Sequence, residues 1–116
     1  MDLIDIESLR PASGGSPRFE GYLHGATSSF FVVKSPPGKG ADKHRHPYEE
    51  TFILLDGEIE VIVAGEMQRI SSGSVIVIPP NTWHEFKNRS DHNLLMVNIH
   101  PVPQMIQENW TPEMES

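Results

Sequence analysis

Three histidines and one glutamate near the middle of the chain have the types and the spacing of a metal site. His44 and His46 are two positions apart, and Glu50 follows four positions later. Because alternate side chains of a strand share a face, both histidines can point inward, and His84 can do the same from a second segment. Three imidazoles and one carboxylate suit a divalent transition metal ion such as iron, manganese, nickel, zinc or copper. In an octahedral coordination sphere, four protein ligands leave two positions for water, dioxygen or a chelating substrate.

The residues around these four resemble the paired signature of the cupin superfamily, which specifies ten positions. Nine of them are met in register, and at the tenth Asn81 stands where the family has glycine. Asparagine is the residue other than glycine that most readily adopts left-handed backbone angles, so we expect the turn before His84 to keep its shape. The nine matching residues are Gly38, His44, His46, Glu50, Gly57, Gly73, Pro79, His84 and Asn88.

This resemblance implies a small single-domain protein of the all-β class. The expected fold is the cupin-type double-stranded β-helix, or jelly-roll barrel, with little helix. The resemblance also implies that His44, His46, Glu50 and His84 together hold the ion.

Short strand-like segments separated by glycine follow one another from Thr51 to His100, with the spacing of an antiparallel sandwich or barrel. We expect an N-terminal arm over residues 1–18, consisting of an edge strand and a linker, and a cupin barrel over residues 19–100. Residues 101–116 are expected to form a C-terminal arm, as a helical turn or an extended segment. This arm could pack on its own barrel or on a neighbouring subunit.

Composition narrows the partners that the protein can have. The 116 residues suffice for one domain, and the formal net charge of −7, with no lysine or arginine run, argues against nucleic acid and anionic membranes. No apolar run approaches the roughly 18 residues needed to span a bilayer, so a cytoplasmic location is the default expectation. The chain has no cysteine, and metal ligands must therefore be imidazole and carboxylate groups.

The inner wall that strand parity predicts is mostly apolar, which favours a small organic substrate with an aromatic or alkyl body and an oxygen-bearing end. Three residues close to the motifs or in phase with the pocket are candidates for acid–base catalysis, namely Tyr48, Glu49 and His100. The predicted pocket residues are Phe52, Leu54, Val61, Phe86, Met96 and Asn98.

Fold and metal alone do not define a reaction. Among cupins, the chain resembles metal-dependent enzymes, and we favour dioxygenase chemistry on an enol, catechol or polyketide-like compound. A non-redox lyase, isomerase, decarboxylase or cyclase is the first alternative, and a non-enzymatic module that binds a small ligand is the second. A barrel this short would gain core by pairing, so we expect a homodimer.

Overall fold

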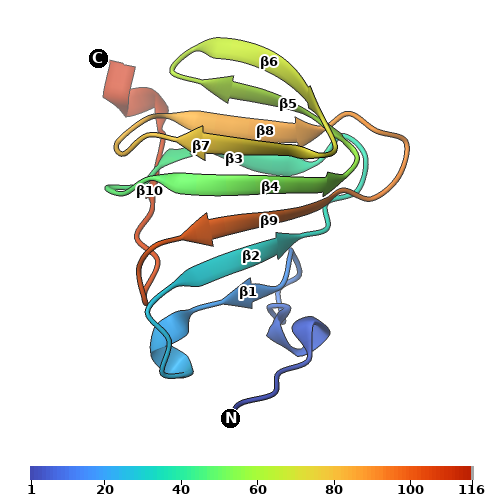
Figure 1. The fold of residues 1–116 in the computed structure, drawn as a ribbon. Coiled ribbons are helices and arrows are strands. Elements are labelled where there is room, and N and C mark those ends of the chain that lie inside the picture. The colour runs from blue at the N-terminus through green and yellow to red at the C-terminus, as the bar shows by residue number, and fades with distance from the viewer. Residues whose placement is uncertain (116) are drawn as a thin grey trace.

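The computed structural model describes residues 1–115, whose strands form two five-stranded antiparallel sheets that face each other (Figure 1). The strand order is β1-β2-β9-β4-β7 in the first sheet and β10-β3-β8-β5-β6 in the second. This arrangement confirms the expected all-β class. The strands are β1 Arg18–Phe19, β2 Ser29–Val33, β3 Gly40–Arg45, β4 Glu50–Asp56, β5 Glu58–Val63, β6 Glu66–Ser71, β7 Ser74–Ile78, β8 His84–Asn88, β9 Leu95–His100 and β10 Glu108–Asn109.

Alternating burial along the central strands places one face of each sheet in the core. Along β9, every second residue from Met96 to His100 is buried, and β4 alternates in the same way from Glu50 to Leu54. Both strands therefore bury a row that is apolar at one end and polar at the other. Between the sheets, buried apolar side chains pack into one cluster: Val33, Phe52, Leu54, Ile59, Val61, Ile78, Phe86, Leu94 and Met96.

The N-terminal arm differs from the expected edge strand. Ile6–Leu9 forms a 3-10 turn, η1, and the first strand begins only at Arg18. The cause is local, because the carbonyl of Asp5 accepts hydrogen bonds from both the backbone N–H and the hydroxyl of Ser8. A second 3-10 turn, η2 Gly21–Leu23, follows β1.

The turn that precedes His84 is the one in which asparagine replaces the family's glycine. Asn81 has a φ of 57°, in the left-handed region, as the sequence predicts. Its backbone N–H also donates to the carbonyl of His46 at 2.7 Å. This bond ties the loop between β7 and β8 to the histidine pair.

The C-terminal arm is extended and lies against its own barrel. Strand β10 pairs with β3, so that Asn109 is opposite His44, and a last 3-10 turn, η3 Pro112–Glu115, follows. Among residues 1–115, no helix has the length and apolar character that crossing a bilayer requires.

Candidate metal centre

Three strands meet at one end of the barrel and bring the predicted ligands together. His44 lies on β3, His46 directly follows that strand, and Glu50 and His84 are the first residues of β4 and β8. One ligand atom from each of the four residues lies within 4.8 Å of all the others, and all four side chains are buried. The cluster could therefore hold a metal ion.

Backbone carbonyls fix the tautomer of all three histidines. In each ring, Nδ1 lies within hydrogen-bonding distance of a carbonyl oxygen, which can only accept. Each ring must therefore donate from Nδ1, and in the neutral ring Nε2 carries a lone pair directed at the cluster, as metal ligation requires. The pairs are His44 with Asp42 at 2.6 Å, His46 with Ile106 at 2.7 Å and His84 with Thr82 at 2.8 Å.

The carboxylate of Glu50 completes a donor set that fits a divalent ion. Its Oε1 atom lies 2.9 Å from Nε2 of His84 and 3.2 Å from Nε2 of His46. Nε2 of His84 lies in hydrogen-bonding geometry with this oxygen, whereas Nε2 of His46 has no hydrogen-bond partner among the described residues. Two ligand atoms bound at right angles to one ion, with bonds of about 2.1 Å, lie about 3 Å apart. The contacts thus have the spacing of neighbouring ligands of one cation.

Burial and charge keep these groups in the forms that bind metal. Burial lowers the pKa of His44 to about 4, so its imidazole is neutral at neutral pH. Burial acts to raise the pKa of Glu50, but contacts with His100, His46 and His84 outweigh it and hold that pKa well below its usual range. The cluster therefore presents an ionised carboxylate together with at least one neutral imidazole.

A cavity of about 490 Å³ opens beside the cluster. Three of the predicted ligands, His44, His46 and Glu50, form part of its wall, which is otherwise partly apolar and partly polar. Its other lining residues are Ser16, Phe31, Val33, Ser35, Gly40, Ala41, Asp42, Lys43, Phe86, Asn98, His100, Gln107, Asn109 and Trp110.

The predicted pocket residues all face the interior, but only two of the six line this cavity. Phe86 and Asn98 do so. Phe52, Leu54 and Met96 instead pack in the core, because large side chains from both sheets fill the middle of the barrel. Val61 packs in the same core and also borders a second cavity between the edges of the two sheets.

The three candidates for acid–base catalysis have different surroundings. Glu49 is exposed to solvent, because it follows the opposite parity to the buried Glu50, and the structure does not bring it to the site. Tyr48 and His100 are both buried, and the tyrosine hydroxyl lies 2.7 Å from Nδ1 of His100. Nε2 of His100 lies 2.9 Å from Oε2 of Glu50, so both residues belong to the surroundings of the cluster.

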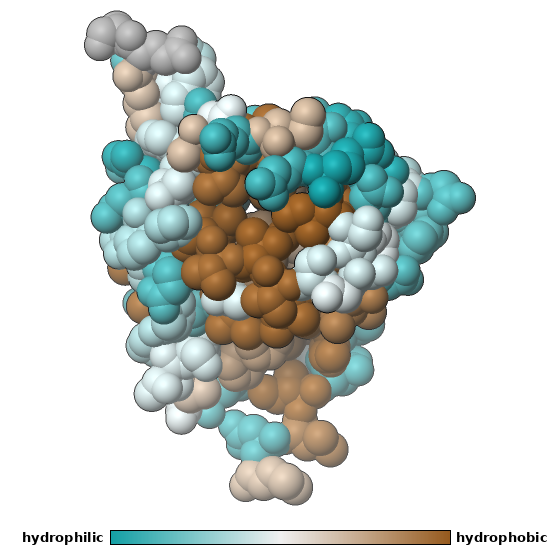
Figure 2. All heavy atoms as spheres, turned by 45° about the horizontal axis from the view of Figure 1, so that its top comes forward, coloured by the Kyte–Doolittle hydropathy of each residue, from teal (hydrophilic) through white to brown (hydrophobic). Residues whose placement is uncertain are grey.

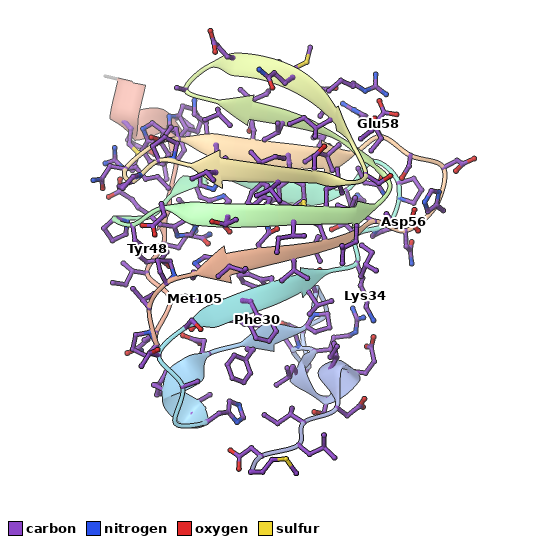
Figure 3. The ribbon with its side chains drawn as sticks, in the orientation of Figure 1. Phe30, Lys34, Tyr48, Asp56, Glu58 and Met105 are labelled. Carbon is purple, nitrogen blue, oxygen red and sulfur yellow. The ribbon has the colours of Figure 1, made fainter. Side chains whose placement is uncertain are left out.

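The C-terminal arm contributes residues that the sequence did not single out. Figure 3 shows Tyr48 and Met105 at the same end of the barrel, where β4 begins and β9 ends. The neighbouring residue Ile106 contacts the site through its backbone, and Gln107, Asn109 and Trp110 line the cavity. The sequence could not predict these contributions. A contact made by the backbone does not depend on residue type, and β10 is too short to show a periodic pattern.

A double-sheet barrel with three histidines and one glutamate at its mouth defines a cupin-type protein with a candidate metal site. Residues 31–100 match the family model described as the cupin domain, and the chain belongs to the cupin family.

Two relatives and one solved structure extend this comparison. The polyketide synthase CurC of Streptomyces cyaneus is 31% identical over 101 residues, which cover 82% of this chain and 66% of that protein. The quercetin 2,3-dioxygenase of Bacillus subtilis is 31% identical over 77 residues, which cover 63% of this chain but only 23% of the enzyme. An uncharacterised Klebsiella pneumoniae protein with a double-stranded β-helix domain has the same fold, with a TM-score of 0.72 at 19% identity over 93% of this chain and 96% of that one.

Proposed function

We propose that this protein is a metal-dependent enzyme that acts on a small organic substrate of the enol, catechol or polyketide type, with dioxygenase chemistry. The observation that carries the proposal is the convergence of three Nε2 lone pairs and one carboxylate oxygen beside a cavity of about 490 Å³. His44, His46, Glu50 and His84 would hold the ion. A bound divalent ion would supply Lewis-acid chemistry toward substrate oxygens and, if it is iron, reactivity toward dioxygen.

The cavity walls offer different contacts to such a substrate. Phe31, Val33 and Phe86 can pack against a planar or alkyl body. Asn98 is 4% exposed, and its Oδ1 has no hydrogen-bond partner among the described residues. This amide can therefore accept a hydrogen bond from a substrate hydroxyl, and a bound ligand that fills the cavity would exclude water from the site.

The relatives support two reaction types for this site. The similarity to a quercetin 2,3-dioxygenase, although limited to a quarter of that enzyme, favours oxygenation. The similarity to a protein named as a polyketide synthase covers more of the chain and supports non-redox chemistry on a polyketide, such as cyclisation, as the second candidate.

Oxygen consumption separates these alternatives. We expect the protein loaded with Fe(II) to consume dioxygen when catechol, gentisate or a 3-hydroxyflavone is added, and the His46→Ala variant treated in the same way to consume none. Conversion of a polyketide-like substrate without dioxygen, at equal rates with zinc or manganese, would instead support the non-redox candidate. Tight binding of these compounds with no turnover under any condition would identify a binding module and contradict an enzymatic role.

We also propose that the protein is a homodimer that pairs through an apolar surface of the first sheet. Figure 2 shows apolar side chains gathered on one side of the barrel. On the outer face of β7, Val75 is 65% exposed and Val77 is 61% exposed, and they pair with Ile53 and Thr51 of β4. A sheet that faced water would carry polar side chains here. A second copy of the chain offers the same uncharged surface and can cover this one.

The oligomeric state tests this proposal directly. The wild-type protein should have the mass of a dimer in light scattering coupled to gel filtration, and the double variant Val75→Lys/Val77→Lys should have the mass of a monomer. Leu23→Lys is the matched control, because Leu23 is 64% exposed on η2 and outside the sheet. A monomeric wild type, or a dimer that survives the double substitution, would contradict the proposed surface.

A further inference from the structure

Three buried side-chain atoms in the part of the chain that the structure describes have no hydrogen-bond partner. They are Nε2 of His46, Nε2 of His100 and Oδ1 of Asn98, and all three residues line the cavity beside the cluster. Buried polar groups of native proteins are nearly always paired, so each exception needs an explanation. The shared location of these three indicates that their partner is something that occupies the cavity.

Two of the three atoms lie in or beside the metal cluster. His46 is one of the four candidate ligands, and Nε2 of His100 lies 2.9 Å from Oε2 of Glu50. Asn98 is a neutral amide outside that set of candidate ligands. Its oxygen therefore needs an explanation of its own.

The neighbours of Asn98 in its sheet offer this oxygen no hydrogen-bond donor. Asn98 lies on β9, opposite Phe31 of β2 and Phe52 of β4. Side chains of directly opposite residues share a face of the sheet, so both flanking groups are aromatic rings. Along β9, the next residues on this face are Met96 and His100, each roughly 7 Å away along the strand. The amide is thus surrounded by side chains that leave its oxygen unpaired.

An unpartnered amide at this position is unfavourable for the fold. Asn98 is 4% exposed, and burying a polar atom without a partner costs folding free energy that an apolar side chain would not cost. Natural proteins break such rules mainly at functional sites. We therefore expect the missing partner to be a bound ligand.

The cavity allows one small molecule to reach both the amide and the ion. Asn98 borders the same space of about 490 Å³ as His44, His46 and Glu50, and the ring of Phe31 lines it as well. A planar body can pack against that ring while its oxygens bind the ion. The carbonyl oxygen of an amide can only accept a hydrogen bond, so the ligand group that meets it must be a donor, such as a hydroxyl.

We propose that Asn98 is a specificity-determining residue, which accepts a hydrogen bond from a substrate hydroxyl that is additional to the oxygens bound to the ion. The substrate class is thereby narrowed to enol, catechol or polyketide-like molecules that carry at least one further hydroxyl group. This inference deepens the proposed function and rests on it, because the ion holds the other end of the substrate.

Thermal unfolding of the metal-free protein tests whether the fold itself needs this amide. Asn98→Leu should unfold at the same temperature as the wild type or at a higher one, because the substitution removes an unpartnered polar atom. Asn88→Leu is the matched control, since Asn88 is 1% exposed but its Nδ2 donates to the carbonyls of Ser35 and His92 at 3.0 and 2.8 Å. This control should unfold at a temperature lower by about 5 °C or more. An equal loss in both variants would make Asn98 a structural residue and overturn the proposal.

Binding of matched catechols to the zinc-loaded protein, with dioxygen excluded, tests the contact itself. Each pair of probes carries either a hydroxyl or a methyl group of similar size, at carbon 3 or at carbon 4 of catechol. At one of these positions, the wild type should bind the hydroxyl compound about 10-fold more tightly than the methyl compound. Asn98→Leu should lose or reverse this preference, and comparison within a pair cancels the effect of the size of leucine. A preference that survives in Asn98→Leu, or none at either position in the wild type, would overturn the proposal.

Zinc titration separates this proposal from the proposed function. Asn98→Leu should bind zinc like the wild type, and a large loss of zinc affinity would place Asn98 among the ligands and overturn its role in specificity. A wild type that binds no zinc would instead refute the metal-dependent function. The catechol measurement reports binding alone, so an absence of turnover refutes the proposed reaction without altering the hydroxyl preference.

Discussion

His46→Ala is expected to weaken the binding of a divalent metal ion by more than about 100-fold, beyond the effect typical for partners of metal ligands. Nε2 of His46 has no hydrogen-bond partner among the described residues, while its Nδ1 is held by the Ile106 carbonyl at 2.7 Å. The ring is thus oriented in advance with its lone pair directed at the cluster. Alanine removes one of four donors, and no other imidazole occupies that position.

His92→Ala is the matched control for this substitution. His92 is an exposed histidine outside the predicted ligand set and outside the lining of the cavity, and its ring nitrogens contact Asp56 and Asp91 at 3.0 and 2.9 Å. Its removal should leave metal affinity unchanged within about twofold. The measurement is the metal content per chain after dialysis against a chelator of known affinity, with circular dichroism to verify folding. Equal metal content in the two variants would contradict the ligand assignment.

The sequence was sufficient to predict that His44, His46, Glu50 and His84 converge, because local rules and the family motif together place them. Strand parity puts alternate residues on one face, and this places His44 inside with Arg45 between it and His46. The left-handed turn at Asn81 could also be predicted, because it depends on the preference of one residue type. Local rules of this kind act over a few residues, and the family motif supplies the register between the two segments.

The parts of the site that could not be predicted depend on contacts distant in sequence. The pairing of Tyr48 with His100 joins residues 52 positions apart, and that of His46 with the Ile106 carbonyl joins residues 60 apart. Parity alone also could not separate cavity from core, since Phe52 and Asn98 are opposite each other in the register and both face inward. Only the filling of the barrel by large side chains determines which of them borders open space.

Gly40→Ala is expected to destabilise the metal-free protein by about 3 kcal/mol or more and to disrupt the metal cluster as well. A Cβ atom at Gly40 would lie 2.0 Å from the carbonyl oxygen of Phe86, a backbone atom that cannot move without shifting β8. Gly40 pairs with Lys87 on β8, and the same strand pair carries His44 opposite His84. Separating β3 from β8 to accommodate the methyl group would therefore also move two candidate metal ligands apart.

Gly38→Ala distinguishes this close contact from a general intolerance of side chains in the segment before His44. Gly38 has a φ of +79°, and an added Cβ there would meet no atom within 4 Å. Gly38→Ala should therefore lower the free energy of unfolding only by the strain of a left-handed residue, about 1–2 kcal/mol. Urea denaturation of both metal-free variants measures the difference, and zinc titration shows whether the cluster survives. Gly40→Ala should lose both stability and zinc binding, because Gly40 allows the close approach of the two strands that carry the candidate ligands. Gly38→Ala should bind zinc like the wild type, because Gly38 is needed only for the backbone angles of the turn. Equal free energies of unfolding for the two variants would refute this distinction.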